Sequence, residues 1–144
     1  MTKEEKQILL KDLCARLPYG VKVWTSEFLD SIEEYHPNEI LTLSNLDYYI
    51  KESIEVKPYL RPISSMTEDE MDKLFDVLHI DKDGNDEDWI KINDALGIKF
   101  FFPTGKWVED VAEAYDYLNS IHIDYRGLIE KGLALEAPKD MYKQ

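Results

Sequence analysis

The sequence predicts an α+β fold with an N-terminal helix, a small bent antiparallel sheet that forms a partial barrel, and a C-terminal set of three or four helices. Apolar residues recur at helical spacing up to residue 17 and again after residue 67, and runs typical of strands lie between. A chain of 144 residues, 44% of them hydrophobic, can bury a core without disulfides or metals. We therefore expect a single domain over 1–144, with helix and sheet in 1–63 and mainly helices in 64–144.

The first predicted helix runs from Thr2 or Lys3 to Arg16. Thr2 and Glu5 have the spacing of a capping box, and Pro18 ends the helix. One apolar face is formed by leucines at helical spacing: Leu9, Leu10, Leu13 and Leu17.

Residues 21–56 predict most of the sheet. Residues 21–24 are expected to form one strand, 40–45 a second, and 48–56 one or two more, because strand-forming residues alternate there. Residues 28–35 have the spacing of a short helix.

Two proline pairs follow, Lys57-Pro58 and Arg61-Pro62. Each pair forces extended backbone and limits hydrogen bonding, so residues 59–63 are expected at the edge of the sheet, leading outward.

The C-terminal half predicts helices. Thr67 and Glu70 have capping-box spacing, and apolar residues follow on one face: Met71, Leu74, Phe75 and Leu78. A second helix is expected over 105–119, capped by Thr104, with these side chains inward: Val108, Val111, Ala112, Tyr115 and Leu118. A last helix is expected from Asp124 to near Gly132, a glycine that suits a left-handed C-terminal residue.

For two stretches between these helices, the sequence predicts no single secondary structure. Residues 89–98 fit both a helix and a strand, and residues 100–102 predict a short buried strand or a core plug.

The net charge of −13 argues against a general binder of nucleic acid or anionic membranes, since both need positive charge. Residues 67–88 contain ten acidic and two basic residues and so carry −8 of that charge. The segment fits a solvated face, a docking surface for a basic partner, or a mimic of the nucleic-acid backbone. For a basic partner, the predicted contacts are loop carboxylates: Asp83, Asp86, Glu87 and Asp88.

Metal binding is not predicted. Residues 81–92 begin like an EF-hand loop but carry Asp86, Asp88 and Ile92 where that loop needs glycine, an apolar residue and a bidentate Glu. His36, His79 and His122 share no ligand spacing, and His122 is expected to be a packed, hydrogen-bonded residue. The single cysteine, Cys14, excludes an internal disulfide and a zinc site with two thiolates, and is expected to be a buried structural thiol.

No catalytic or cofactor-binding residue is predicted. The sequence has no GxSxG, GxxxxGK[ST] or GxGxxG motif, and its six glycines are scattered singly. Thirty acids supply many carboxylate pairs by chance, so they identify no acid–base site.

A cytoplasmic location is expected. The chain has no apolar run of about 18 residues, and its N-terminus lacks the apolar core of a signal peptide.

Three stretches carry a family resemblance: LCARLPYGVKV from Leu13, KPYLRPISSMTEDE from Lys57 and DYRGLIEKGLALEAP from Asp124. They resemble uncharacterised small acidic proteins encoded by gut Bacteroidales and their phages or mobile elements. The resemblance implies an accessory protein of such an element, and it implies no activity, cofactor or catalytic residues.

These observations predict a non-enzymatic interaction protein whose partner is another protein of phage or host, with no direct nucleic-acid or membrane binding. One alternative is an acidic mimic that inhibits a DNA- or RNA-binding protein, and another is a small hydrolase that uses carboxylates. An apolar patch with aromatic anchors would favour the interaction protein. Acids spaced across one face would favour the mimic. A pocket with two carboxylates whose pKa values are shifted in opposite directions would favour the hydrolase.

Overall fold

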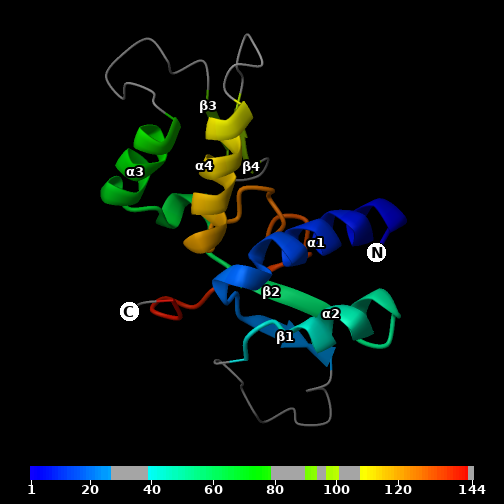
Figure 1. Ribbon diagram of the computed structural model, residues 1–144. Helices are drawn as coiled ribbons and strands as arrows, with labels where there is room; N and C mark the ends of the chain where they lie inside the picture. The colour runs from blue at the N-terminus through cyan, green and yellow to red at the C-terminus, as the bar shows by residue number, and fades with distance from the viewer. Residues whose placement is uncertain (27–38, 79–89, 94–96, 101–107, 143–144) are drawn as a thin grey trace.

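The computed structural model describes residues 1–26, 39–78, 90–93, 97–100 and 108–142 (Figure 1). The fold is α+β, as predicted, and begins with a helix. The helices are α1 (Lys3–Arg16), α2 (Leu43–Ile50), α3 (Glu68–Leu78) and α4 (Val108–Ser120). The strands are β1 (Val23–Thr25), β2 (Val56–Leu60), β3 (Ile90–Asn93), β4 (Gly97–Phe100) and β5 (Leu135–Glu136). The predicted helix over 28–35 and the end of the 100–102 run lie outside the described residues.

The main sheet is mixed and open, so the predicted antiparallel partial barrel is wrong. Its strand order is β1-β2-β5, with β2 antiparallel to β1 and parallel to β5. Only two residues of β5 pair with β2, and so short a strand gives the sheet little extent for closure. Residues 90–93 and 97–100, open between helix and strand in the sequence, form a separate antiparallel pair, β3–β4.

β2 is the central strand, so the predicted edge position of residues 59–63 is wrong for Tyr59 and Leu60. Pro58 is tolerated because it pairs with Val23 at a position where an antiparallel ladder makes no hydrogen bond to the partner strand, so its missing N–H costs nothing. The neighbouring hydrogen bond comes from the Tyr59 N–H, which donates to the Lys22 carbonyl at 2.8 Å. On its other side, pairing with β5 begins only at Tyr59.

Residues 43–50 form α2, not the strands predicted over 40–45 and 48–56. Thr42 caps the helix in a capping box with Asn45, a local signal that the alternating pattern concealed. Burial of Leu46 and Tyr49 against the α1 side of the core favours the helix, because residues three apart share one helical face.

α1 matches the prediction, including the Thr2–Glu5 capping box, with Leu9 and Leu13 fully buried. Cys14 is exposed, so its predicted burial is wrong. Five residues separate it from Leu9, which places it on the opposite face of the helix.

α3 begins at its predicted capping box: the Thr67 hydroxyl accepts from the Glu70 N–H at 3.1 Å. Leu74 and Leu78 are buried, and Met71 and Phe75 are half-buried against the same cluster, which confirms the predicted face. α4 confirms the second C-terminal helix, although Thr104 lies outside the described residues and Ala112 is exposed rather than inward.

Residues 124–132 form turns, not the predicted last helix. The Asp124 carboxylate accepts from the N–H groups of Leu128 and Ile129, at 2.8 and 2.9 Å, in place of helical carbonyls. Gly127 has a φ of +71°, outside the helical range. Gly132 has the predicted left-handed conformation, with a φ of +75°. The described residues after position 64 therefore hold two α-helices.

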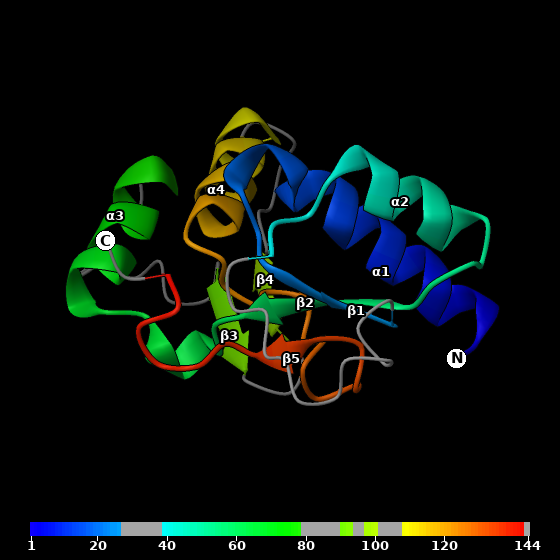
Figure 2. The same ribbon diagram turned by 90° about the horizontal axis from the view of Figure 1, so that it is seen from below.

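The buried apolar side chains form two clusters. One joins α1, α2, β1 and β2 with Leu128, Leu133 and Ala134; the other joins α3, α4 and Ile98 with Ile63, Ile123 and Tyr125. Correspondingly, α1 and α2 lie together on one side of the molecule and α3 and α4 on the other (Figures 1 and 2). No helix in the described ranges is both long enough and apolar enough to span a membrane.

Candidate functional site

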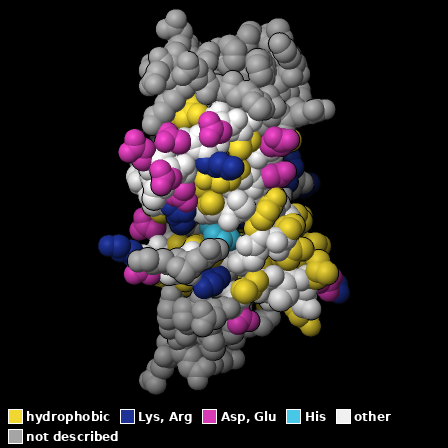
Figure 3. Space-filling view, turned by 60° about the vertical axis from the view of Figure 1, so that its left-hand side comes forward, with side chains coloured by type: hydrophobic (Ala, Val, Ile, Leu, Met, Phe, Trp, Pro, Cys, Tyr) yellow, Lys and Arg dark blue, Asp and Glu magenta, His cyan; other side chains and the backbone are white. Residues whose placement is uncertain are grey.

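The predicted partner contacts Asp83, Asp86, Glu87 and Asp88 lie outside the described residues, as do His36 and His79. The described part of the acidic segment is α3, where Glu68, Asp69 and Asp76 are exposed. Acidic side chains gather in the upper described part of the surface in Figure 3. The third acid of the first turn, Glu70, is instead paired with Arg61.

The Arg61–Glu70 pair attaches α3 to the chain after β2. Both guanidinium Nη atoms donate to the Glu70 carboxylate at 2.7 Å, which lowers the pKa of Glu70. Arg61 also donates to the Ser65 hydroxyl and to the carbonyls of Ser65 and Ile121. The pair lines a cavity of about 590 Å³ beside residues 137–142, but with its donors engaged, Arg61 acts there as a structural clamp.

α2 carries three of the six large apolar side chains that are exposed in the described structure; the other three are Met1, Tyr19 and Ile40. Leu43 is 73% exposed, Ile50 56% and Tyr48 47%. Leu43 and Ile50 are seven residues apart and so lie on one side of the helix. The exposed Asp47–Lys51 ion pair, with a 2.9 Å contact, separates them from Tyr48. We call Leu43, Tyr48 and Ile50 the α2 apolar surface.

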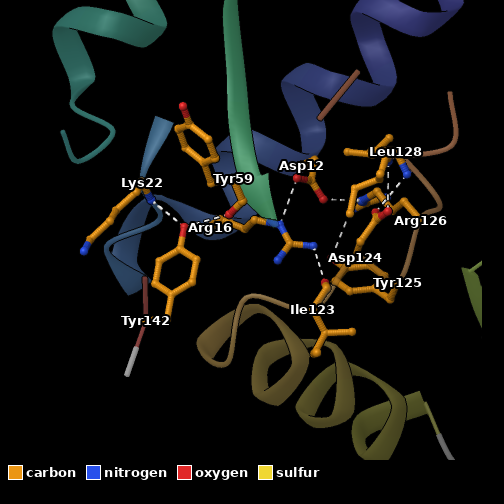
Figure 4. Close-up of polar contacts among 11 residues, drawn as sticks. Asp12, Arg16, Lys22, Tyr59, Ile123, Asp124, Tyr125, Arg126, Leu128 and Tyr142 are labelled. Carbon is orange, nitrogen blue, oxygen red and sulfur yellow. Dashed lines mark hydrogen bonds and ion pairs between the residues drawn. The ribbon is translucent and has the colours of Figure 1, made fainter. Parts of the chain in front are cut away.

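A buried polar network lies where the two core clusters meet (Figure 4). Arg16 and Asp12, both with no exposed side-chain area, form an ion pair at 2.8 Å. Arg16 also donates to the Ile123 carbonyl at 2.7 Å, and Arg126 donates to the second Asp12 oxygen at 3.1 Å. One carboxylate therefore holds two arginines, and α1 is tied to residues 123–126 by charge-assisted bonds.

Asp124 lies beside this network, and its carboxylate accepts hydrogen bonds from backbone N–H groups. It is 3% exposed, and burial raises its pKa, while its two bonds from Leu128 and Ile129 favour the ionised form. It is not among the residues that line the Arg61 cavity with Glu70. Asp124, whose pKa is raised, and Glu70, whose pKa is lowered, thus do not line this described cavity together, and the carboxylate hydrolase stays a prediction.

His122 is packed, as predicted, and is held under the C-terminal segment. It is 8% exposed and stacks on Tyr142 with ring centroids 3.7 Å apart. Its Nδ1 has no hydrogen-bond partner among the described residues, so the predicted side-chain hydrogen bond is not seen at that atom. Burial and the nearby charges of Arg16, Arg61 and Lys22 lower the pKa of His122 to about 4, so the ring is neutral at pH 7.

Tyr142 fastens the C-terminal segment to the main sheet. Its hydroxyl accepts from the Lys22 N–H at 2.8 Å and donates to the Tyr59 carbonyl at 2.7 Å (Figure 4). Lys22 also donates through Nζ to the Met141 carbonyl at 3.0 Å. Burial raises the pKa of Tyr142 to about 12.

Asp12 and Arg16 were missed by sequence reasoning although a signal was present. They are four residues apart on the face that carries Leu9 and Leu13, and charged residues on an apolar face indicate a buried pair. Within the described ranges, no group of three or more His, Cys, Asp or Glu side chains is placed to hold a metal ion.

Comparison with protein-family models, curated proteins and solved structures finds no match to this chain. The resemblance of the stretches from Leu13, Lys57 and Asp124 therefore stays a prediction.

Proposed function

We propose that the protein is a non-enzymatic interaction protein that binds another protein through the α2 apolar surface. The observation that carries the proposal is the 73% exposure of Leu43 and 56% exposure of Ile50 on a helix of eight residues. Removing such side chains from water contributes roughly 1.5–3 kcal/mol each when burial is complete. A phage or host protein is the expected partner, from the resemblance described above.

Tyr48 supplies an aromatic anchor on the other side of the Asp47–Lys51 pair, and tyrosine is enriched among residues that dominate binding energy. The charge of the chain defines the partner further. At a net charge of −13, a partner with an apolar surface edged by Lys and Arg is favoured over an acidic one.

The test compares three tagged proteins as baits in native cells: wild type, Leu43→Ser/Ile50→Ser, and Tyr19→Ser as a control at another exposed apolar position. Proteins bound to wild type and the control but lost by the double variant are identified by mass spectrometry. The identified partner is then purified, and its affinity is measured by calorimetry. We expect the double substitution to weaken binding by about 100-fold. Equal affinity for wild type and the double variant contradicts the proposal.

A second candidate, the acidic mimic of nucleic acid, is favoured by the exposed acids of α3. Asp69 and Asp76 are seven residues apart on that helix, so their Cα atoms are about 10 Å apart along one side, close to three phosphate-to-phosphate steps along the axis of a DNA strand.

The mimic is tested through the predicted loop contacts. Changing Asp83, Asp86 and Glu87 to Lys is expected to slow association with a basic partner at low salt and to flatten its salt dependence, because opposite charges act mainly on the association rate. Equal rates at low salt would show that these three carboxylates belong only to a solvated face.

A further inference from the structure

We propose that a second site, the cavity between α4 and the turn at Tyr125, binds a small aromatic anion whose negative group contacts Arg126 and Lys131. The cavity has a volume of about 650 Å³, within the range of small-molecule sites. It is built by four separate parts of the chain: α1, β4, α4 and the turns after residue 124. The proposal is independent of the α2 apolar surface.

The charge at the cavity wall is opposite to that of the whole chain. Two bases, Arg126 and Lys131, line the cavity with one described carboxylate, Asp116, whereas acids outnumber bases by 30 to 17 over the sequence. An anion is therefore the charged group that this wall favours.

Arg126 is held in place before any ligand binds. Its Nε donates to Asp12, which is fully buried and fixed in turn by Arg16. Its Nη2 donates to the Tyr125 hydroxyl at 3.3 Å, and no bond from its Nη1 is found within the described residues. An arginine that is already anchored in this way loses little side-chain entropy when it binds a carboxylate or phosphate.

The remaining walls of the cavity are aromatic and apolar, which favours a ligand that carries an aromatic ring. Tyr115 and Tyr125 form a tilted pair with centroids 5.0 Å apart, and Ile98 lies beside them. Tyr115 and Asn119 are four residues apart on α4 and so share one face of it. Asn119 is 3% exposed, and its Oδ1 has no donor among the described residues. Rings on the wall favour a flat apolar group through offset or edge contacts.

The experiment titrates the full-length, ¹⁵N-labelled protein with benzoate at low salt and follows amide resonances by NMR. Benzamide serves as the uncharged match of benzoate, and acetate as the match without a ring. We expect benzoate to shift the signals of Tyr115, Asn119, Tyr125 and Arg126 with a dissociation constant roughly tenfold lower than that of either match. Phenyl phosphate, run in parallel, distinguishes a carboxylate from a phosphate site.

Two lysine variants test whether benzoate binds in this cavity. Lys131→Glu is expected to weaken benzoate binding roughly threefold, and Lys139→Glu, the same change at an exposed lysine of the Arg61 cavity, is expected to leave it unchanged. Circular dichroism spectra of both variants check that each is folded. The proposal is overturned if benzamide binds as tightly as benzoate, if both lysine variants weaken binding equally, or if the shifted signals lie outside this cavity.

Discussion

The Tyr142 hydroxyl takes the place of one backbone hydrogen bond between β1 and β2. In a regular antiparallel ladder, Lys22 and Tyr59 would exchange two bonds, but only the Tyr59 N–H reaches the Lys22 carbonyl directly, at 2.8 Å. The other bond passes through the Tyr142 hydroxyl, as acceptor from Lys22 and donor to Tyr59. A single C-terminal side chain thus completes the sheet.

Tyr142→Phe is expected to lower the free energy of unfolding by about 1 kcal/mol, because it leaves a donor and an acceptor without their bridge. Urea denaturation measures the change. Tyr48→Phe, at an exposed tyrosine, is expected to stay within about 0.5 kcal/mol of wild type. Identical midpoints for wild type and Tyr142→Phe would show that water or a direct bond replaces the hydroxyl fully.

His122 makes stability depend on pH. Its folded-state pKa is about 4 against an ordinary value of 6.5, so the unfolded chain binds the proton more readily than the folded one between those values. Stability should therefore fall as pH decreases from 6.5 to 4, by up to about 3 kcal/mol.

The measurement is the difference in unfolding free energy between wild type and His122→Asn over pH 4–7. Asparagine does not titrate and accepts the left-handed backbone at this position, where φ is +64°. The lowered pKa of Glu70 acts in a separate window, below its ordinary value of 4.5. Parallel pH profiles for the two proteins would exclude this role of His122.

At the scale of elements, capping boxes decide where three helices begin. Each box provides acceptors for two backbone N–H groups at a helix start. The three boxes are formed by Thr2 with Glu5, Thr42 with Asn45, and Thr67 with Glu70. Two of them were used to predict helices, and both predictions are confirmed. The third does not match the usual sequence pattern, because Asn45 stands where Glu or Gln is expected.

Thr67→Ala should destabilise the protein by about 1 kcal/mol, since the Glu70 N–H at the start of α3 loses its acceptor. Thr67→Ser keeps the hydroxyl and is the matched control. Guanidinium denaturation followed by circular dichroism gives both values. The cap carries no stability if the alanine and serine variants unfold at the same midpoint as wild type.

At the scale of the whole molecule, the Asp12–Arg16 pair connects the two core clusters. It sits on α1 in the first cluster, and its bond to the Ile123 carbonyl reaches the second. Arg16→Met should lower the free energy of unfolding by roughly 3–5 kcal/mol, because it removes the closer of the two arginines paired with the buried Asp12 carboxylate and leaves the Ile123 carbonyl without its donor.

Lys51→Met is the matched control for that prediction. It breaks the exposed Asp47–Lys51 pair, which has the same i, i+4 spacing, and should cost only about 0.3–0.5 kcal/mol. Urea unfolding of both variants compares the pairs directly. Similar losses for the two would mean that burial adds nothing to the Arg16 bond.

The sequence by itself determined the features that depend on neighbouring residues: the α+β class, α1 and α3 with their caps, and the left-handed glycine at Gly132. These follow from hydrogen bonds and side-chain spacing within a few residues. Tertiary structure alone decided where Pro58 stands in the sheet and which residues line the cavity between α4 and the turn at Tyr125. Each of those outcomes depends on partners far away in the chain, such as Lys22 with Tyr59 or Asp12 with Arg126, and no local pattern encodes such pairs.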